Sequence, residues 1–222
     1  MIKICRAVAP RLRRLRQDAV ALSAASGLVA VLALFSTALQ AQTLAPEKLQ
    51  LCASCHGANG ATSATPETPF LAGLQPTYFV RQMADFKSGK RKSTIMQGIV
   101  AGIDEKDFQE YANYFRAQKP VAPGKGDPKL TAQGKEIYFE GIVGNAVPAC
   151  AGCHNEDGTG TNRYPRLAGQ NPAYTIQQML AYKNGQRDND DRGLMRAVAQ
   201  RMTEAEIRAV SEFIVTMKGD AE

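Results

Sequence analysis

The apolar positions of the chain recur at the spacing of amphipathic helices. One stripe near the C-terminus, with intervals of three and four, consists of Ile207, Val210, Phe213, Ile214 and Met217. A similar stripe lies about a hundred residues earlier and consists of Phe108, Tyr111, Ala112 and Phe115. Each set lines one face of a helix. Thr203 and Glu206 form a capping box for the later helix, and Asp104 opens the earlier one.

Two segments led by proline predict two further helices. Pro172 follows Asn171, a capping residue before a first-turn proline, and Gly185 ends the helix after about residue 184. Segment 75–89 has the same form. No segment alternates apolar and polar residues as a strand would. The predicted fold class is therefore all-α, with short helices joined by loops and no sheet.

The second half of the chain repeats the first. Segment 69–73, Pro-Phe-Leu-Ala-Gly, matches segment 165–169, Pro-Arg-Leu-Ala-Gly. Identical residues continue the match at Pro76/Pro172, Tyr78/Tyr174, Gln82/Gln178, Met83/Met179, Lys87/Lys183, Gly89/Gly185 and Arg91/Arg187. After a three-residue insertion it resumes at Met96/Met195, Ile103/Met202, Phe108/Ile207 and Phe115/Ile214. The chain thus holds two copies of one domain.

The repeat also sets the expected domain boundaries. Residues 120–129 are rich in proline and glycine, and we interpret them as a linker between a first domain, 42–119, and a second domain, 130–222. Residues 1–41 have a basic start, an apolar run from about Ala19 to Leu39 and an alanine-rich end. This pattern predicts a signal peptide cut near Ala41, with an uncleaved membrane anchor as the alternative. Export would place the protein in the periplasm.

Most of the positive charge belongs to this leader. It carries six of the Lys and Arg residues and one acidic residue, so that about +1 of the chain's net charge of +6 remains after cleavage. The rest of the chain therefore lacks the concentrated basic surface that nucleic-acid binding requires.

The chemistry lies in Cys52-Ala-Ser-Cys55-His56, which returns as Cys150-Ala-Gly-Cys153-His154. C-x-x-C-H is the attachment motif of c-type haem: the two thiols form thioethers with the porphyrin, and the histidine becomes an axial ligand of the iron. These four cysteines are all that remain once Cys5 leaves with the leader, and the two histidines are the only ones in the chain. We therefore predict two covalently bound haem c groups, one per domain.

The second axial ligand follows by elimination. With no third histidine in the chain, methionine is the remaining common ligand. Two repeat-related pairs compete. Met83 and Met179 fall in the middle of predicted helices, where a core role is favoured. Met96 and Met195 fall after the helix-ending glycines, on predicted loops, and we take them as the ligands. Ordinary packing is the alternative for this pair.

These motifs together resemble class I cytochromes c, and the tandem arrangement resembles the di-haem cytochrome c4 family. The resemblance covers residues 46–218. It implies two domains of short helices, each wrapped round its haem. It also implies that the carbonyl groups of Pro69 and Pro165 accept a hydrogen bond from the axial histidines, and that Arg91 and Arg187 lie near the haem propionates. The first copy departs from the family in having Glu47 where glycine is usual and only a short opening helix, Pro46 to Leu51, so its docking on 111–115 is in question.

The function expected from these features is electron transfer without substrate chemistry, with membrane respiratory complexes or a terminal oxidase as redox partners. The two copies should face each other across a pseudo-two-fold axis. Charges differ near the two methionines: Lys87, Lys90, Arg91 and Lys92 precede the first, and Asp188, Asp190 and Asp191 precede the second. We expect a dipolar molecule whose first haem has the higher potential.

Two other classes of function remain open. One is a di-haem, peroxidase-like oxidoreductase or the electron-transfer subunit of a dehydrogenase; a peroxidase needs an iron without its methionine. The other is a haem-free zinc or dithiol protein that uses the C-x-x-C pairs.

Overall fold

The computed structural model describes residues 46–219. The predicted signal peptide, 1–41, lies outside the described residues. The described residues, 46–219, belong to one compact unit. Over the described range all regular secondary structure is helical apart from a single bridge between Ile142 and Val147, and loops connect the helices. None of the helices in that range combines the length and the apolar character needed to cross a membrane.

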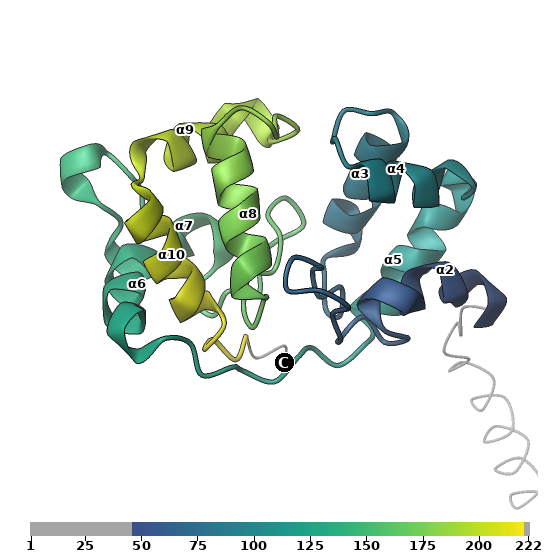
Figure 1. Ribbon diagram of the computed structural model, residues 1–222, viewed down its shortest axis with the longest axis horizontal. Helices are drawn as coiled ribbons and strands as arrows, with labels where there is room; N and C mark the ends of the chain where they lie inside the picture. Colours follow the sequence, from purple (N-terminus) through teal and green to yellow (C-terminus); the bar gives the residue numbers. More distant parts are fainter. Residues whose placement is uncertain (1–45, 220–222) are drawn as a thin grey trace, which may run out of the picture. The chain divides into compact units, whose positions relative to one another are not determined.

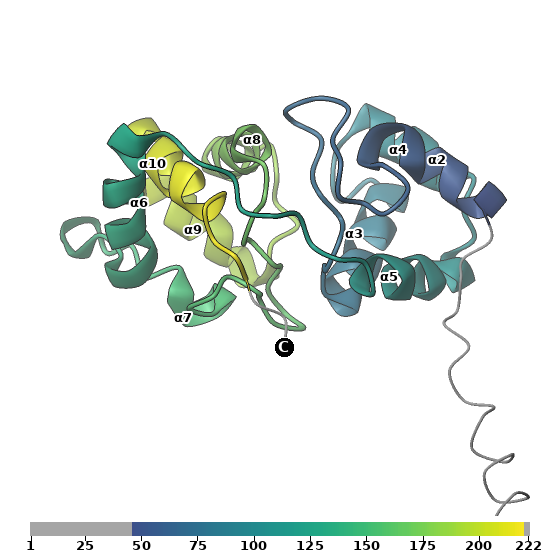
Figure 2. The same ribbon diagram turned by 90° about the horizontal axis from the view of Figure 1, so that it is seen from below.

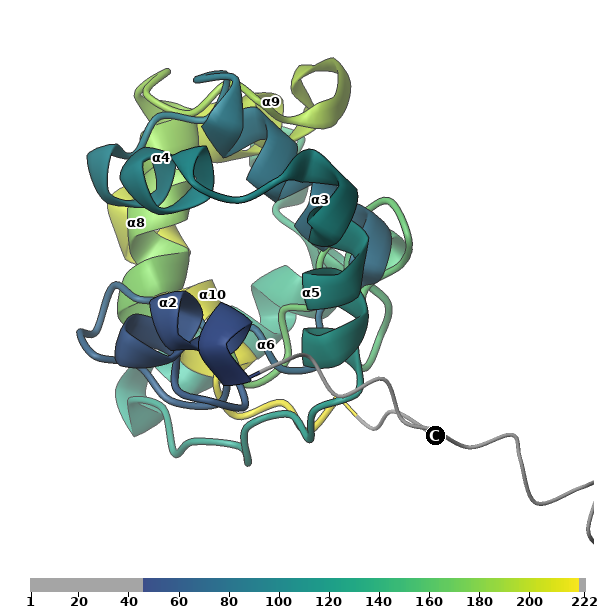
Figure 3. The same ribbon diagram turned by 90° about the vertical axis from the view of Figure 1, so that its right-hand side faces the viewer.

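The first lobe, residues 46–116, is built from four α-helices and one short 3₁₀ turn (Figure 1). In chain order these are α2 (Pro46–His56), α3 (Pro76–Lys87), α4 (Thr94–Ala101), η1 (Glu105–Asp107) and α5 (Phe108–Arg116). Helix α3 contacts both α4 and α5, as Figure 3 shows from the first-lobe side. The predicted stripe of α5 is buried in the core with Phe79, Met83 and Phe86 of α3.

The second lobe, residues 128–219, contains five α-helices and two 3₁₀ turns. They are α6 (Pro128–Glu140), η2 (Val143–Asn145), α7 (Ala151–His154), α8 (Pro172–Lys183), η3 (Asp191–Gly193), α9 (Leu194–Arg201) and α10 (Glu204–Ile214). Helices α6 and α10 lie side by side (Figure 2), and α10 also contacts α8. The core of this lobe again contains the predicted stripe of its last long helix.

The helix ends follow the sequence signals. The Thr203 hydroxyl accepts from the Glu206 amide, and the Glu206 carboxylate accepts in return from the Thr203 amide, which completes the capping box. The side chain of Asn171 accepts from Ala173 N at 3.2 Å. Gly89 and Gly185 take φ values of 77° and 70° after α3 and α8, a left-handed conformation that glycine adopts at little cost.

The expectation that Met96 and Met195 lie on loops is wrong. Met96 lies in the first turn of α4, and Met195 lies in the first turn of α9. The physical reason is a capping contact that restarts the helix after the glycine turn: the hydroxyl of Ser93 accepts a hydrogen bond from Met96 N at 3.3 Å. In the second lobe a carboxylate oxygen of Asp190 accepts from Arg196 N at 3.0 Å.

The segment between the lobes is held against the second lobe. Gly124 N donates to the carbonyl of Val215 at 2.8 Å, and Asp127 N donates to the Glu212 carboxylate at 2.8 Å. Helix α6 begins at Pro128, so the last two residues of the predicted linker are helical.

Candidate functional site

Each C-x-x-C-H motif ends in a buried histidine at the end of a helix. His56 closes α2 and is 7% exposed, and His154 closes α7 and is 5% exposed. Nδ1 of His56 lies 2.8 Å from the carbonyl oxygen of Pro69, and Nδ1 of His154 lies 2.9 Å from that of Pro165. Because a carbonyl only accepts, Nδ1 carries the proton in both rings. Nε2 is therefore left with its lone pair, as a metal ligand requires.

Burial favours the uncharged form of both rings. Desolvation lowers the pKa of His56 and of His154, and the hydrogen bond to the proline carbonyl opposes that shift only in part. Burial also raises the pKa of Cys52 and of Cys150 to about 11. None of the four motif cysteines is in a disulfide, so both pairs of thiols are available for thioether bonds.

The loops after the two motifs share two features, although the first loop is two residues longer between the histidine and its proline. Gly57 and Asn155 follow the histidines at equivalent positions, with φ of 73° and 68°. Asn155 combines this φ with a ψ of 157°, a region that residues other than glycine rarely adopt, and its side-chain amide donates to Gly160 O at 2.8 Å. The glycines that end the repeated Leu-Ala-Gly motif both donate to the last helix, Gly73 to Phe115 O at 2.8 Å and Gly169 to Ile214 O at 3.0 Å.

A cavity of about 220 Å³ lies next to the second motif. Its lining includes Cys150, Cys153 and His154, and these face a largely apolar wall that contains Leu167, Val198, Val210 and Ile214. Two thiols, an imidazole with a free Nε2 and an apolar wall are the set of groups that a covalently attached haem requires. The residues present therefore fit the predicted cofactor.

Both candidate methionines of the second lobe line this cavity. Met195 and Met179 do so, together with Met202, which is 1% exposed. In the first lobe Met83 is 5% exposed within the core, and Met96 packs against the same core from α4. The repeat-equivalent thioethers thus lie at the cavity in the second lobe and in the apolar core in the first lobe.

Arg91 connects the two lobes. Its guanidinium donates to Gln82 in its own lobe at 2.9 Å, and to the Tyr174 hydroxyl at 3.0 Å and the Gln178 side chain at 2.9 Å in the other lobe. It also lies 4.6 Å from the centre of the Phe86 ring.

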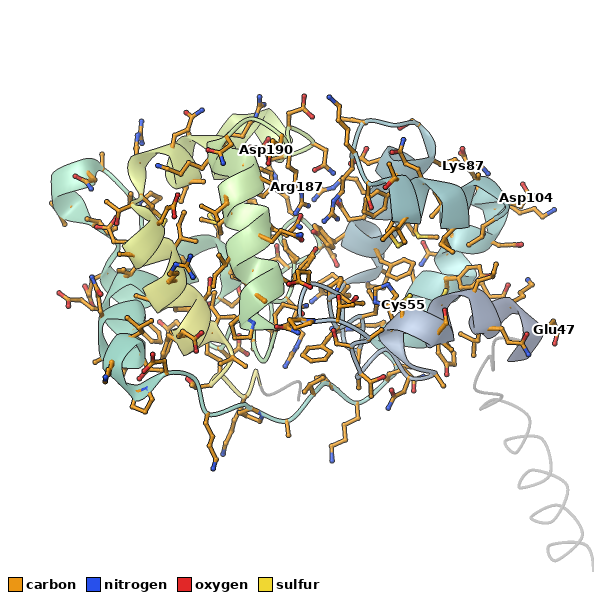
Figure 4. The ribbon with its side chains drawn as sticks, in the orientation of Figure 1. Glu47, Cys55, Lys87, Asp104, Arg187 and Asp190 are labelled. Carbon is orange, nitrogen blue, oxygen red and sulfur yellow. The ribbon has the colours of Figure 1, made fainter. Side chains whose placement is uncertain are left out.

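Arg187 makes the reciprocal set of contacts. It donates to Gln178 in its own lobe at 2.9 Å, and to the Tyr78 hydroxyl and the Gln82 side chain in the first lobe, both at 3.1 Å. Its guanidinium lies 4.5 Å from the Tyr182 ring. Figure 4 shows Arg187 on the side of α8 that faces α3. Because the partners are repeat-equivalent, the contacts are those of the expected pseudo-two-fold axis.

This cluster buries more positive than negative charge. Arg91 and Arg187 are each 7% exposed, and the only acidic residue bonded into the cluster among the described residues is Asp85, which accepts from Asn189 at 2.7 Å. Burial would raise the pKa of Tyr78, but the charges of Arg187 and Arg91 outweigh it and lower that pKa. The cluster therefore creates a positive potential that an anion would relieve.

The acidic residues before Met195 are largely neutralised. The side chain of Asp190, 2% exposed, accepts from Arg196 Nε at 2.8 Å, and Asp191 is paired with Arg163. Of the three, only Asp188 is fully exposed. Two of the three acidic residues that precede Met195 are thus offset by arginines, which weakens the charge difference expected between the two methionine sites.

The polar residues of the inter-lobe cluster were missed as functional candidates. Tyr78, Gln82 and their counterparts appeared only as matches in the repeat. The available signal was that two polar residues one helical turn apart are identical in both copies. Such identity is unusual on a solvent-exposed helix face. Arg81, which also lines the second-lobe cavity, has no such signal because its counterpart is Gln177.

Comparisons with known proteins agree with this geometry. Residues 131–218 match the family model described as Cytochrome c. A cytochrome c4 of Pseudomonas aeruginosa is 37% identical over 170 residues, which cover 75% of this chain and 84% of that protein. A thiosulfate dehydrogenase electron acceptor of Thiomonas intermedia is 34% identical over 187 residues, covering 82% and 85%. The crystal structure of reduced recombinant cytochrome c4 from Pseudomonas stutzeri superposes with a TM-score of 0.73 at 34% identity, over 77% of this chain and 95% of that one.

Proposed function

The chain belongs to the cytochrome c4 family of di-haem electron-transfer proteins, and we propose that each lobe holds its haem c through its own C-x-x-C-H motif. Cys52 and Cys55 form the thioethers of the first lobe, with His56 as the proximal ligand. Cys150, Cys153 and His154 do the same in the second lobe. The observation that carries the proposal is the pair of histidine–proline hydrogen bonds, 2.8 and 2.9 Å long, which fix both rings with Nε2 unprotonated.

Met96 and Met195 are the proposed ligands on the opposite face of each iron. Both occupy the first turn of an eight-residue helix whose start is held by a side-chain acceptor, the N-cap Ser93 in α4 and Asp190, which precedes the N-cap, in α9. Met83, by contrast, is 5% exposed within the core. A thioether ligand favours the ferrous state and raises the potential.

An iron with both axial positions filled has no open position for peroxide or oxygen, and it changes only its valence. This supports an electron carrier over a peroxidase-like enzyme. The electron-transfer subunit of a dehydrogenase remains a second candidate, because relatives at 34% and 32% identity are named as thiosulfate dehydrogenase electron acceptors. In that role the chain receives electrons from a dehydrogenase and passes them to a respiratory complex or terminal oxidase.

Arg91 and Arg187 are proposed to hold the haem propionates at the contact between the lobes. The two guanidiniums share Gln82 and Gln178 as acceptors, and only Asp85 offsets their charge among the residues described. Propionates carry the negative charge that this buried cluster lacks. Both cofactors would then meet the same hydrogen-bond network, which favours electron exchange between them.

The site of action is proposed to be the periplasm, reached through the leader at 1–41. Haem c is attached to exported apoproteins, and an oxidising compartment suits a chain whose remaining cysteines are all used in attachment. Contact with a membrane would occur through the redox partners, or through the leader if it is not removed.

Haem quantitation combined with carbon monoxide binding tests the carrier against the enzyme. The purified protein should contain two haems per chain, stay low-spin in both oxidation states and bind carbon monoxide slowly and incompletely. One haem per chain, or a high-spin iron that binds carbon monoxide rapidly in the wild-type protein, would contradict the proposal. The alternative role as a dehydrogenase subunit is tested by asking whether a purified thiosulfate dehydrogenase and thiosulfate reduce the haems of this protein.

A further inference from the structure

Arg81 of the first lobe contributes to the cavity of the second lobe. It lines that cavity with Cys150 and His154, although it comes from α3. Its Nη2 donates to the carbonyl of Arg163 at 3.1 Å, which ties the side chain to the second lobe. Its guanidinium lies 5.4 Å from the ring of Tyr78.

The Nε–H of Arg81 has no acceptor. It is the one buried side-chain nitrogen or oxygen in the described part of the chain without a hydrogen-bond partner. Buried donors are almost always paired, because an unmet donor costs the full desolvation of the group. Such an exception calls for a ligand at the site. Arg81 also makes no ion pair with a described residue, whereas Arg163 beside it is paired with Asp191.

The feature belongs to one lobe only. The repeat partner of Arg81 is Gln177, which is neutral and exposed. The pseudo-two-fold axis that relates Arg91 to Arg187 therefore does not generate a second copy of this donor. The first lobe therefore contributes a cationic side chain to the second-lobe cavity, and the second lobe contributes no cationic side chain from the equivalent position to the first lobe.

We propose that Arg81 is an inter-lobe positioning residue whose Nε–H donates to a carboxylate of the cofactor in the second-lobe cavity. The inference rests on the proposed function, since haem c supplies the carboxylate as one of its propionates. A guanidinium paired with a propionate reduces the negative charge near the iron, and so favours the ferrous state of the second haem alone.

The test is a redox titration of the holoprotein carrying Arg81→Gln. This substitution introduces the residue that the second copy has at the equivalent position, Gln177. At a fixed potential, the ferric-to-ferrous ratio of the second haem should rise about tenfold, equivalent to about 59 mV for a one-electron couple. The ratio of the first haem should change less than twofold. The two haems are told apart by the paramagnetically shifted haem methyl resonances, assigned to the second lobe through nuclear Overhauser contacts to Leu167.

Lys92→Gln is the matched control. It also removes one positive charge from the first lobe, but Lys92 is exposed and its field is screened, so both ratios should change less than twofold. If Arg81→Gln does not accumulate, Arg81→Lys keeps the charge and loses the Nε–H, and a change of at least twofold confined to the second haem is expected.

The proposal is overturned by unchanged ratios in the Arg81 variant, by equal changes at both haems, or by a change as large in the Lys92 variant. Failure of the proposed function is seen separately. It would appear in the wild-type protein as a missing haem or a high-spin iron, before any variant is compared.

Discussion

The two lobes share their haem motifs but differ in how the first helix packs against the last. In the second lobe α6 packs on α10 with backbones in close approach: a Cβ added to Gly134 would lie 2.0 Å from the carbonyl oxygen of Ala209. In the first lobe α2 contacts α5 through side chains. Lys48 Nζ lies 2.8 Å from the Glu110 carboxylate, and the Tyr111 hydroxyl donates to Lys48 O at 3.2 Å.

The chain path explains this difference. In the first lobe α2 runs without a break from Pro46 to His56, so the motif and the docking segment form one helix. In the second lobe a ten-residue loop separates α6 from α7, and α6 is free to take its own angle against α10. The expectation of a short opening helix, Pro46 to Leu51, is wrong: α2 has 11 residues because it continues through the motif to His56, and it does contact α5. Fewer than two turns of it precede Cys52 and are available for docking. The attached cofactor therefore matters more for holding α2 than for holding α6.

The largest expected effect on the difference between the lobes is at Gly134. Gly134→Ala should lower the free energy of unfolding of the second lobe by about 3 kcal/mol, because the new Cβ overlaps a backbone oxygen that cannot rotate away. Glu47→Ala is the control in α2. Glu47 is exposed at the end of the first lobe away from α8 (Figure 4), and its replacement should change stability by less than about 0.5 kcal/mol.

Urea unfolding of the holoprotein, followed by circular dichroism, measures both effects. A loss below about 1 kcal/mol for Gly134→Ala would show that α6 and α10 can separate at little cost. The asymmetry between the lobes would then have to be abandoned.

A smaller effect is expected at the turn that follows each histidine. Gly57→Ala should cost about 2 kcal/mol, because alanine is strained at a φ of 73° and its Cβ would lie 1.9 Å from Oγ1 of Thr62, which has to move. Gly57→Asn alone should cost about as much, because its Cβ meets the same hydroxyl, whereas the second lobe has Gly160 at the position of Thr62. Combining it with Thr62→Gly, which reproduces the residues of the second-lobe turn, should recover part of the loss. Thermal unfolding of the single and the double variant measures the difference, and no recovery in the double variant would mean that the two turns are not equivalent.

The smallest effect concerns the ion pair of the first lobe. The hydrogen bond that the Lys48 ammonium donates to the Glu110 carboxylate raises the pKa of Lys48 above its ordinary value of 10.5. The stabilisation is therefore fully present below pH 10.5, and it is lost as the pH rises through the higher pKa of the folded state. Lys48→Met should destabilise the first lobe slightly at neutral pH and low salt, and the difference from wild type should shrink in high salt and above that pH. Urea unfolding in the two buffers checks this, and a difference independent of both salt and pH would count against an electrostatic contact.

Much of this arrangement was predictable from sequence because local signals determined it. The proline-led helices, the helix-ending glycines and the Thr203 capping box all act within a few residues. The histidine–proline contacts came from the family resemblance. Met96 and Met195 were predicted to lie on loops because the contacts that hold the two helix starts are weak sequence signals. One is the hydroxyl of the N-cap Ser93, and the other is Asp190, which lies five residues before its methionine and is not itself the N-cap.

The contacts between the lobes could not be predicted, because they depend on how two copies meet. Arg81 and Gln82 are adjacent in sequence, yet one lines the second-lobe cavity and the other bridges two guanidiniums. Likewise, the pairing of Asp191 with Arg163 joins residues that are 28 positions apart. A count of charges along the chain does not show that the acidic residues near the insertion form ion pairs. In the fold, two of the three are paired with arginines.

The central claim is that each lobe carries one iron ligated by histidine and methionine, and the near-infrared sulfur-to-iron band of the oxidised protein tests it most directly. The wild-type protein should show this band at the amplitude expected for two methionine-ligated irons per chain. Met96→Leu and Met195→Leu should each remove half of it and the double variant all of it, while Met83→Leu and Met179→Leu leave it unchanged. A band that survives the double variant, or that disappears with Met83 or Met179, would contradict the ligand assignment.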